Sequence, residues 1–127
     1  MIATVTLNVA IDKRYVIENF KLGTVMRVKE CNYTAGGKGL NVSRVAKLMG
    51  EDVTATGFIG GHAGEYVAEK LGQTGVKSNF IKIDDESRSC INFFDEASGK
   101  QTEFLEPGAN VKPEDIDKFL TNLPSII

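Results

Sequence analysis

Residues 34–50, T-A-G-G-K-G-L-N-V-S-R-V-A-K-L-M-G, form a glycine-rich turn followed by a helical pattern. Three of the four residues from 36 to 39 are glycine, so Gly36 and Gly37 let the backbone approach a ligand without an intervening Cβ atom. The first N–H groups of a helix lack intrahelical partners and carry a positive dipole, which favours an anion or a polyhydroxylated molecule. Lys38 adds a cation, and Asn41 adds a side chain that both donates and accepts hydrogen bonds.

The spacing of these glycines excludes two common nucleotide-binding loops. A dinucleotide-binding fingerprint requires G-x-G-x-x-G/A, but counting from Gly37 the third small position is Val42. A Walker A loop requires Ser or Thr after Gly-Lys, and here Gly39 follows. An oxidoreductase half is therefore disfavoured, and a plain flexible turn before an ordinary helix is the remaining alternative.

Three charged residues outside this turn are further candidates for ligand contacts. Asp12 follows an apolar run at residues 2–7, and the carboxyl end of such a strand is where open α/β sheets bind ligands; a turn or cap aspartate is the alternative. Arg88 lies among acidic and hydroxyl residues just before another strand. Arg27 lies on an expected flap and could reach an anion, although exposed charges on edge strands are common.

Length and charge limit the class of protein. The chain has 127 residues, enough for one domain with a core, and a net charge of −2. Residues 1–50 carry a net +5 and residues 51–127 a net −7, so the glycine turn lies in the cationic half. The acidic total and the absence of a basic run argue against nucleic acid. No membrane span or signal peptide is recognisable, so we expect a cytoplasmic protein without membrane contact.

The cysteines and the single histidine offer no metal or redox motif. Cys31 and Cys90 are far apart and no C-x-x-C occurs, so we expect buried or half-buried free thiols and no metal site. His62 is expected at the surface.

The order of apolar patterns predicts an α/β fold. Strands are expected at residues 2–7, 53–59 and 80–83. Between them we expect a helix that follows the glycine turn and stops at Gly50, and another at about 65–73, which indicates parallel pairing. The first helix carries an apolar stripe of helical period at Val42, Val45, Ala46 and Met49. A last helix is expected from Pro113 to about residue 120, followed by the start of a further strand at 123–127.

Two segments predict antiparallel ribbons suited to a lid. Residues 14–32 contain two irregular amphipathic strands separated by Leu22-Gly23-Thr24. Residues 90–94 and 101–105 are joined by E-A-S-G-K, a hairpin signature.

Five motifs in this order resemble the N-terminal part of a ribokinase-like (phosphofructokinase B family) carbohydrate kinase. They are T-L-N-V-A-I-D at 6–12, A-G-G-K-G-L-N-V-S-R at 35–44, G-F-I-G-G-x-x-G at 57–64, S-R-S-C-I at 87–91 and T-E-F-L-E-P-G at 102–108. The match is close to the branch of tagatose-6-phosphate kinase and 1-phosphofructokinase and covers essentially the whole chain.

The resemblance implies a three-layer α/β fold whose mainly parallel sheet is joined by a small β lid at about 13–33 and 89–106, with residues 1–127 forming the sugar-binding part. It implies that a homodimer forms through the lid. It also implies substrate-binding roles: Asp12 and Asn41 would bind sugar hydroxyls, Gly36, Gly37 and Lys38 would line the sugar site, and Arg88, with Arg27 as a weaker candidate, would bind the phosphate of a sugar phosphate.

The reaction implied is transfer of the γ-phosphoryl group of ATP, with Mg²⁺, to a hexose phosphate, tagatose 6-phosphate ahead of fructose 1-phosphate.

The sequence departs from the family pattern in two places. Val9 replaces the usual proline, which removes a fixed φ before Asp12. The G-A-G-D-type motif with the catalytic aspartate does not occur before Ile127, so no catalytic residue is expected in this chain and the ATP-binding part would lie outside it. The alternative is a truncated, non-catalytic module that binds a sugar phosphate or dimerises.

Overall fold

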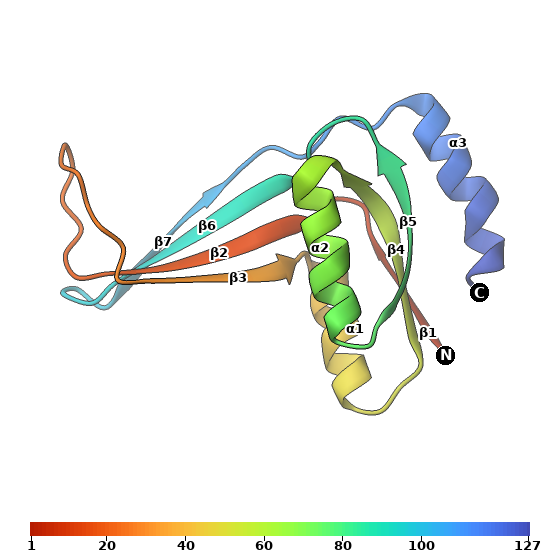
Figure 1. Cartoon of the computed structure of the whole chain (residues 1–127), viewed down its shortest axis with the longest axis horizontal. Helices are drawn as coiled ribbons and strands as arrows, with labels where there is room; N and C mark the ends of the chain where they lie inside the picture. Colours follow the sequence, from red (N-terminus) through yellow and green to blue (C-terminus); the bar gives the residue numbers. More distant parts are fainter.

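The computed structural model describes residues 1–127 and contains two β-sheets joined end to end (Figure 1). In chain order the elements are β1 Ile2–Thr6, β2 Ala10–Ile17, β3 Glu30–Gly36, α1 Lys38–Leu48, β4 Val53–Gly60, α2 Gly61–Gln73, β5 Lys77–Ile83, β6 Arg88–Asp95, β7 Lys100–Leu105, α3 Pro113–Asn122 and a 3₁₀ turn at Leu123–Ser125. The prediction that a strand begins at residue 123 is wrong, because the chain there continues as this short 3₁₀ turn against α3.

The first sheet is parallel, as the alternation of strands and helices predicted. Its order is β1-β4-β5, with α1 and α2 on one face and α3 on the other (Figure 1). The main core lies under α1 and α2 and includes the fully buried side chains of Leu40, Val67 and Leu71. On the opposite face, the Phe58 ring packs against Phe119 of α3, with centroids 5.4 Å apart.

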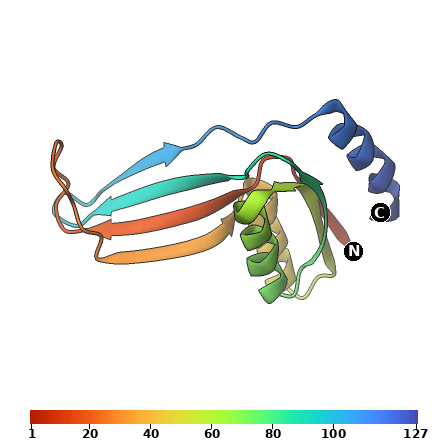
Figure 2. The same cartoon turned by 45° about the horizontal axis from the view of Figure 1, so that its top comes forward.

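The two expected ribbons form one four-stranded sheet, here called the lid, with the order β3-β2-β6-β7. The sequence did not predict the parallel pairing of β2 with β6 that unites them. The lid strands project from the α/β body, and the lid tip is formed by the loop at residues 18–29 and the turn at 96–99 (Figure 2). The strands expected within residues 14–32 are only partly correct: β2 begins at Ala10, residues 18–29 form a loop instead of a tight turn and most of a second strand, and β3 continues to Gly36. The lid therefore begins closer to the body than the expected range of 13–33.

Helix α1 packs through a different face from the one marked by its apolar stripe. Val42, Val45 and Met49 are 56%, 60% and 79% exposed, and within the stripe only Ala46 packs against the core. The buried face instead carries Leu40 and Ser43, and the Ser43 hydroxyl hydrogen-bonds that of Thr4 on β1 at 2.5 Å. Small and hydroxyl-bearing residues therefore form the contact with β1, which an apolar period cannot reveal.

Val9 compensates for the missing proline by burial. Its side chain is 2% exposed and belongs to the main core cluster. The turn between β1 and β2 is thus anchored by packing rather than by a proline ring.

None of the helices is both long and apolar enough to span a lipid bilayer.

Candidate functional site

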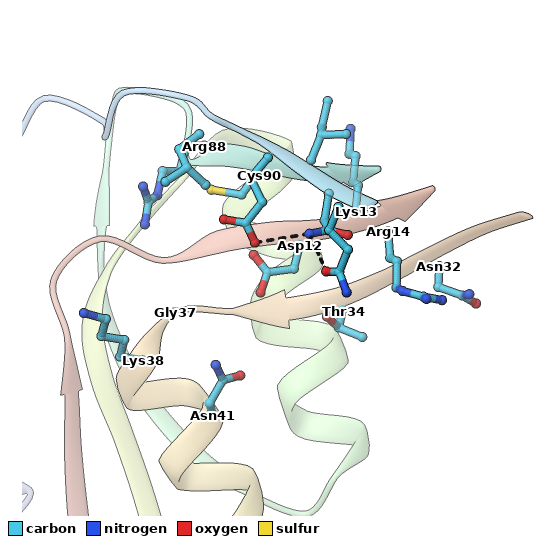
Figure 3. A pocket seen from close by; sticks show the side chains of 15 residues that line it. Asp12, Lys13, Arg14, Asn32, Thr34, Gly37, Lys38, Asn41, Arg88 and Cys90 are labelled. Carbon is cyan, nitrogen blue, oxygen red and sulfur yellow. Dashed lines mark hydrogen bonds between the residues drawn. The ribbon is translucent and has the colours of Figure 1, made fainter. Parts of the chain in front are cut away.

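A cleft of about 510 Å³ lies between the inner face of the lid and the N-terminus of α1 (Figure 3). Residues from the lid strands and from α1 line it: Asp12, Lys13, Arg14, Asn32, Thr34, Gly37, Lys38, Asn41, Arg88, Cys90, Ile91, Asn92, Gln101, Glu103 and Leu105. The structure thus brings together five of the predicted binding residues, Asp12, Gly37, Lys38, Asn41 and Arg88. They come from three separate segments of the chain.

Asp12 lies in the middle of the cleft, on strand β2 rather than in a turn after β1. Strand pairing places it between Thr34 of β3 and Cys90 of β6. Gly36 lies directly beneath its carboxyl group, where a Cβ atom would collide with that group. Gly36 is buried, so this predicted site residue supports Asp12 from below and does not line the cleft.

Burial is the largest influence on the pKa of Asp12. The pKa of its carboxyl is raised above the ordinary value by partial burial, and the positive charges of Arg44 and Arg88 oppose this effect. Glu103 raises the same pKa further through charge repulsion. Asp12 makes no ion pair in the structure, so its oxygens are available to donors from a ligand.

The N-terminus of α1 opens into the cleft without a side-chain cap. Gly37 is its N-cap residue, with φ of 124°, a conformation that favours glycine, and no acidic residue occupies the first turn. Helix α2 also begins after a glycine, but the N–H group of Ala63 donates to Glu86 at 3.3 Å. The uncapped α1 terminus lines the cleft and offers its positive end there, whereas that of α2 does not line it.

Lys38 and Asn41 add side chains from the first turn of α1. Lys38 is exposed and lines the cleft. The Asn41 Oδ1 atom accepts a hydrogen bond from the guanidinium of Arg44 one turn later. This contact fixes the orientation of the amide, so that its Nδ2 atom remains available as a donor.

Arg88 begins strand β6 and is half-buried at the wall of the cleft. Its Nη2 atom is 3.4 Å from the backbone oxygen of Asn8, and its buried Nε atom has no hydrogen-bond partner. No carboxylate forms an ion pair with it. A guanidinium with unused donors in a cleft is suited to bind an anion such as phosphate.

Besides Gly36, which lies beneath Asp12, Arg27 is the predicted site residue that does not line the cleft. It is exposed and belongs to the loop at residues 18–29 between β2 and β3. There it lines a separate hollow with neighbours such as Glu18 and Met26.

Several polar residues of the lid line the cleft without having been singled out from the sequence, among them Arg14, Asn32, Thr34, Asn92, Gln101 and Glu103. The signal that could have revealed them is the period of two in each lid strand, since alternate residues share a face. Cys90 and Asn92 on β6 then fall on the same face as Arg88, and Gln101 and Glu103 share a face on β7.

The cysteine expectation is half correct. Cys90 is half-buried, and burial raises the pKa of its thiol. Cys31 is exposed on β3, contrary to the expectation of a buried thiol, because it lies on a strand at the edge of the lid. His62 is exposed at the start of α2, as expected.

The cleft combines groups of opposite character within a small space. Lys38, Arg88 and the α1 N-terminus can hold an anionic group, while Asp12 and Asn41 can accept from and donate to hydroxyl groups. Figure 3 shows Arg88 and Lys38 toward one end of the cleft, with Asp12 lying between them and Arg14. The arrangement suits a polyhydroxylated molecule with a phosphate at one end.

Comparison with known proteins identifies relatives of this chain. The sequence model of the pfkB family of carbohydrate kinases matches residues 5–124. Tagatose-6-phosphate kinase from Staphylococcus epidermidis is 46% identical over 123 residues, which are 97% of this chain and 39% of the relative. The chain therefore spans about two fifths of the length of the curated relatives it matches.

Solved structures resemble the chain over a similar extent. Phosphofructokinase-2 from Escherichia coli in complex with fructose-6-phosphate superimposes with a TM-score of 0.91 at 26% identity, over 98% of this chain and 41% of that one. A protein from Thermotoga maritima described as a possible 1-phosphofructokinase gives a TM-score of 0.88 at 32% identity, over 99% of this chain and 42% of that one.

Proposed function

The chain belongs to the pfkB family of carbohydrate kinases, and from this premise we propose that it supplies the sugar-phosphate site of an ATP-dependent hexose-phosphate kinase. The ribokinase-like α/β fold expected from the sequence is confirmed by the TM-scores near 0.9. The product of the proposed reaction is a hexose bisphosphate.

One observation carries the proposal most directly. Arg88 has an unpaired buried Nε donor, and Asp12 has no cation partner, yet both line the same cleft. Unsatisfied donors and acceptors in a cleft are satisfied by a ligand that carries both kinds of group. A hexose phosphate offers an anion for Arg88 and hydroxyl donors for Asp12.

Each residue of the cleft then has a role in binding. Arg88 binds the phosphate already on the substrate, and Lys38 with the Gly37 backbone supplies further positive potential. Asp12 and Asn41 hold the sugar hydroxyls, while Gly36 leaves room for the Asp12 carboxyl. These contacts orient the hydroxyl that receives the phosphoryl group, and orientation provides a large part of catalysis in phosphoryl transfer.

Tagatose 6-phosphate is the favoured substrate and fructose 1-phosphate the next. The support is the 46% identity to a relative that is named as a tagatose-6-phosphate kinase. The motifs S-R-S-C-I at 87–91 and T-E-F-L-E-P-G at 102–108 favour the same branch.

The residues of this chain do not form a site for the Mg²⁺ that the family reaction requires. No three His, Cys, Asp or Glu side chains converge as a metal site. We therefore assign the nucleotide site and the catalytic base to a longer polypeptide that contains this chain, consistent with the relatives' greater length.

The open surface of the α/β body suits packing against such a longer polypeptide. Strand β1 is paired on one side only, and Val5 and Leu7 beside it are exposed. Val42, Val45 and Met49 of α1 are exposed as well. Exposed apolar side chains on an unpaired strand edge and on one helix face suit an interaction site, here proposed for the rest of the kinase domain.

The outer face of the lid is the proposed dimer interface. It is aromatic, in contrast to the polar inner face: Tyr15 stacks on Phe93 at 5.9 Å, and the Phe104 ring meets Phe93 edge-on at 5.1 Å. Phe104 remains 56% exposed. Aromatic side chains are enriched in protein interfaces, and a second lid is the proposed partner.

We also propose that the protein is located in the cytoplasm.

Ligand-dependent stability of the 127-residue chain tests the sugar-phosphate site. Tagatose 6-phosphate, fructose 1-phosphate, fructose 6-phosphate and Mg-ATP are each added alone during thermal unfolding. A ligand at 100 times its Kd adds about 2.7 kcal/mol to the free energy of unfolding. We expect this from one hexose phosphate, with the shift lost in Arg88→Ala and retained in the control Lys82→Ala, an exposed lysine on β5.

The proposal would be contradicted if Mg-ATP alone stabilised the chain, or if none of the hexose phosphates did. A longer polypeptide containing this chain should form the bisphosphate from the same sugar. Binding without turnover in every natural form of the protein would favour the alternative, a non-catalytic sugar-phosphate module.

A further inference from the structure

A second carboxylate, that of Glu103, lies in the cleft on the lid strand β7. Strand pairing places Glu103 opposite Asn92 of β6, and Asn92 opposite Arg14 of β2. All three line the cleft. Glu103 reaches the electrostatic environment of Asp12, because its charge raises the pKa of that carboxyl.

Asn92 holds the Glu103 side chain in place. Its Nδ2 atom donates to Glu103 Oε1 at 3.2 Å and to Gln101 Oε1 at 3.1 Å (Figure 3, dashed lines). Its own Oδ1 atom is buried and has no hydrogen-bond partner. The NH₂ group of Asn92 therefore donates to two side chains of β7, and these hydrogen bonds fix the position of Glu103.

No cation neutralises Glu103. The three ion pairs of the chain join Lys29 to Glu96, Lys77 to Asp52 and Lys112 to Asp84, all outside the cleft. Neither of these two carboxylates is paired, and they repel one another across the cleft. This repulsion is offset most directly when hydroxyl groups of a ligand donate hydrogen bonds to them.

We infer that Glu103 is a second hydroxyl-binding carboxylate of the sugar site, positioned by Asn92 and selective for the hydroxyl pattern of the hexose phosphate. The inference rests on the proposed function, because it assigns a residue to the same sugar-phosphate site. It gives the lid a direct part in substrate choice: Arg88 recognises the phosphate, while Glu103 and Asp12 together recognise the sugar.

Isothermal titration of the 127-residue chain with two ligands separates the sugar contact from the phosphate contact. Tagatose 6-phosphate and inorganic phosphate are titrated into wild type, Glu103→Gln and the control Glu30→Gln, an exposed glutamate of β3 outside the cleft. Glu103→Gln keeps an acceptor oxygen but removes the charge, and exchanging a charge-assisted hydrogen bond for a neutral one weakens binding by about tenfold. We expect that loss for tagatose 6-phosphate in Glu103→Gln, with phosphate affinity unchanged and Glu30→Gln equal to wild type.

Monodeoxy analogues of tagatose 6-phosphate identify the hydroxyl concerned. One analogue should bind wild type about tenfold more weakly than the parent sugar, and Glu103→Gln should distinguish the two less strongly, because its hydrogen bond to that hydroxyl is neutral. Because Glu103 is exposed, the variant should retain the wild-type unfolding midpoint.

The outcomes distinguish the two levels of inference. If wild type does not bind tagatose 6-phosphate or the other hexose phosphates, the proposed function fails and the role of Glu103 fails with it. If wild type binds and Glu103→Gln binds equally well, only the role of Glu103 is wrong. Equal weakening of sugar phosphate and inorganic phosphate would also overturn it, because Glu103 would then act on the fold of the cleft.

Discussion

The carboxyl group of Asp12 occupies the space in which a Cβ atom of Gly36 would stand. The two residues lie on paired strands, where Asp12 is opposite Thr34 and Gly36 is opposite Ala10. Gly36 is not among the glycines with positive φ, so its backbone would accept an alanine. Gly36 is therefore required because any side chain at this position would occupy the space that the Asp12 carboxyl fills.

Gly36→Ala should displace Asp12 and weaken binding of the hexose phosphate by at least about tenfold, the effect of losing a charged hydrogen bond. Titration calorimetry measures this loss. Gly72→Ala is the matched control: Gly72 lies in α2 with no atom near the added Cβ, so this change should leave affinity intact and stabilise the chain by about 0.5–1 kcal/mol. Normal affinity in Gly36→Ala would show that Asp12 can shift without cost.

Asp12→Asn should stabilise the protein at neutral pH while weakening ligand binding. Burial raises the pKa of Asp12 in the folded state, so the folded protein binds the proton more tightly than the unfolded chain. Between the ordinary and the raised pKa, stability therefore falls as pH rises, and the deficit is complete above both values. Asp12→Asn has no carboxyl group at this position, so it does not lose folding stability in this way as the pH rises.

Thermal unfolding of Asp12→Asn and wild type across pH 3–8 measures the effect. The midpoint of the variant should exceed that of wild type at pH 7, and the difference should shrink toward acid pH. A lower midpoint at pH 7 would mean that attraction to Arg44 and Arg88 outweighs burial.

Two substitutions on α1 test which face of the helix is packed. Val45 is 60% exposed, so Val45→Lys should change the free energy of unfolding by less than about 0.5 kcal/mol. Leu40 is fully buried, and Leu40→Ala should cost about 2–5 kcal/mol. Urea unfolding of the 127-residue chain measures both. A large cost for Val45→Lys would show that the stripe is packed in solution, for example between copies of the chain.

The proposed dimer predicts an effect of charge on the outer face of the lid. Phe104→Glu places a carboxylate beside the Phe93 ring and should raise the dimer dissociation constant by at least about tenfold. Leu120→Glu on α3, which is 58% exposed, is the control and should leave the dimer unchanged. Sedimentation over a range of concentrations measures both. A monomeric wild type, or equal dimers in all three proteins, would overturn the lid interface.

The parts of the site that were predicted from the sequence depend on local patterns. Gly37, Lys38 and Asn41 belong to one turn and its helix, whose position follows from glycine spacing and apolar period. Asp12 and Arg88 were found because each lies at an end of a strand pattern. The parallel sheet followed in the same way from the alternation of strands and helices.

The parts that were not predicted depend on contacts between distant segments. Asn92 and Glu103 enter the site only through the pairing of β6 with β2 and β7, and no local pattern fixes that register. The packing face of α1 depends on the Thr4–Ser43 hydrogen bond and on Gly39, where a Cβ atom would collide with Thr6 of β1. Such close approach of a helix to a strand leaves no apolar signature.

The parallel pairing of β2 with β6 also sets the order in which the cleft can be assembled. Strands β2 and β3 are adjacent in the chain, so their hairpin closes a short loop, whereas β2 meets β6 only after most of the chain has been brought back onto the lid. Pairings between distant segments form slowly during folding. We therefore expect a folding chain to place Asp12 beside Gly36 before Arg88 arrives, so that the proposed sugar-binding side of the cleft forms before its proposed phosphate-binding side.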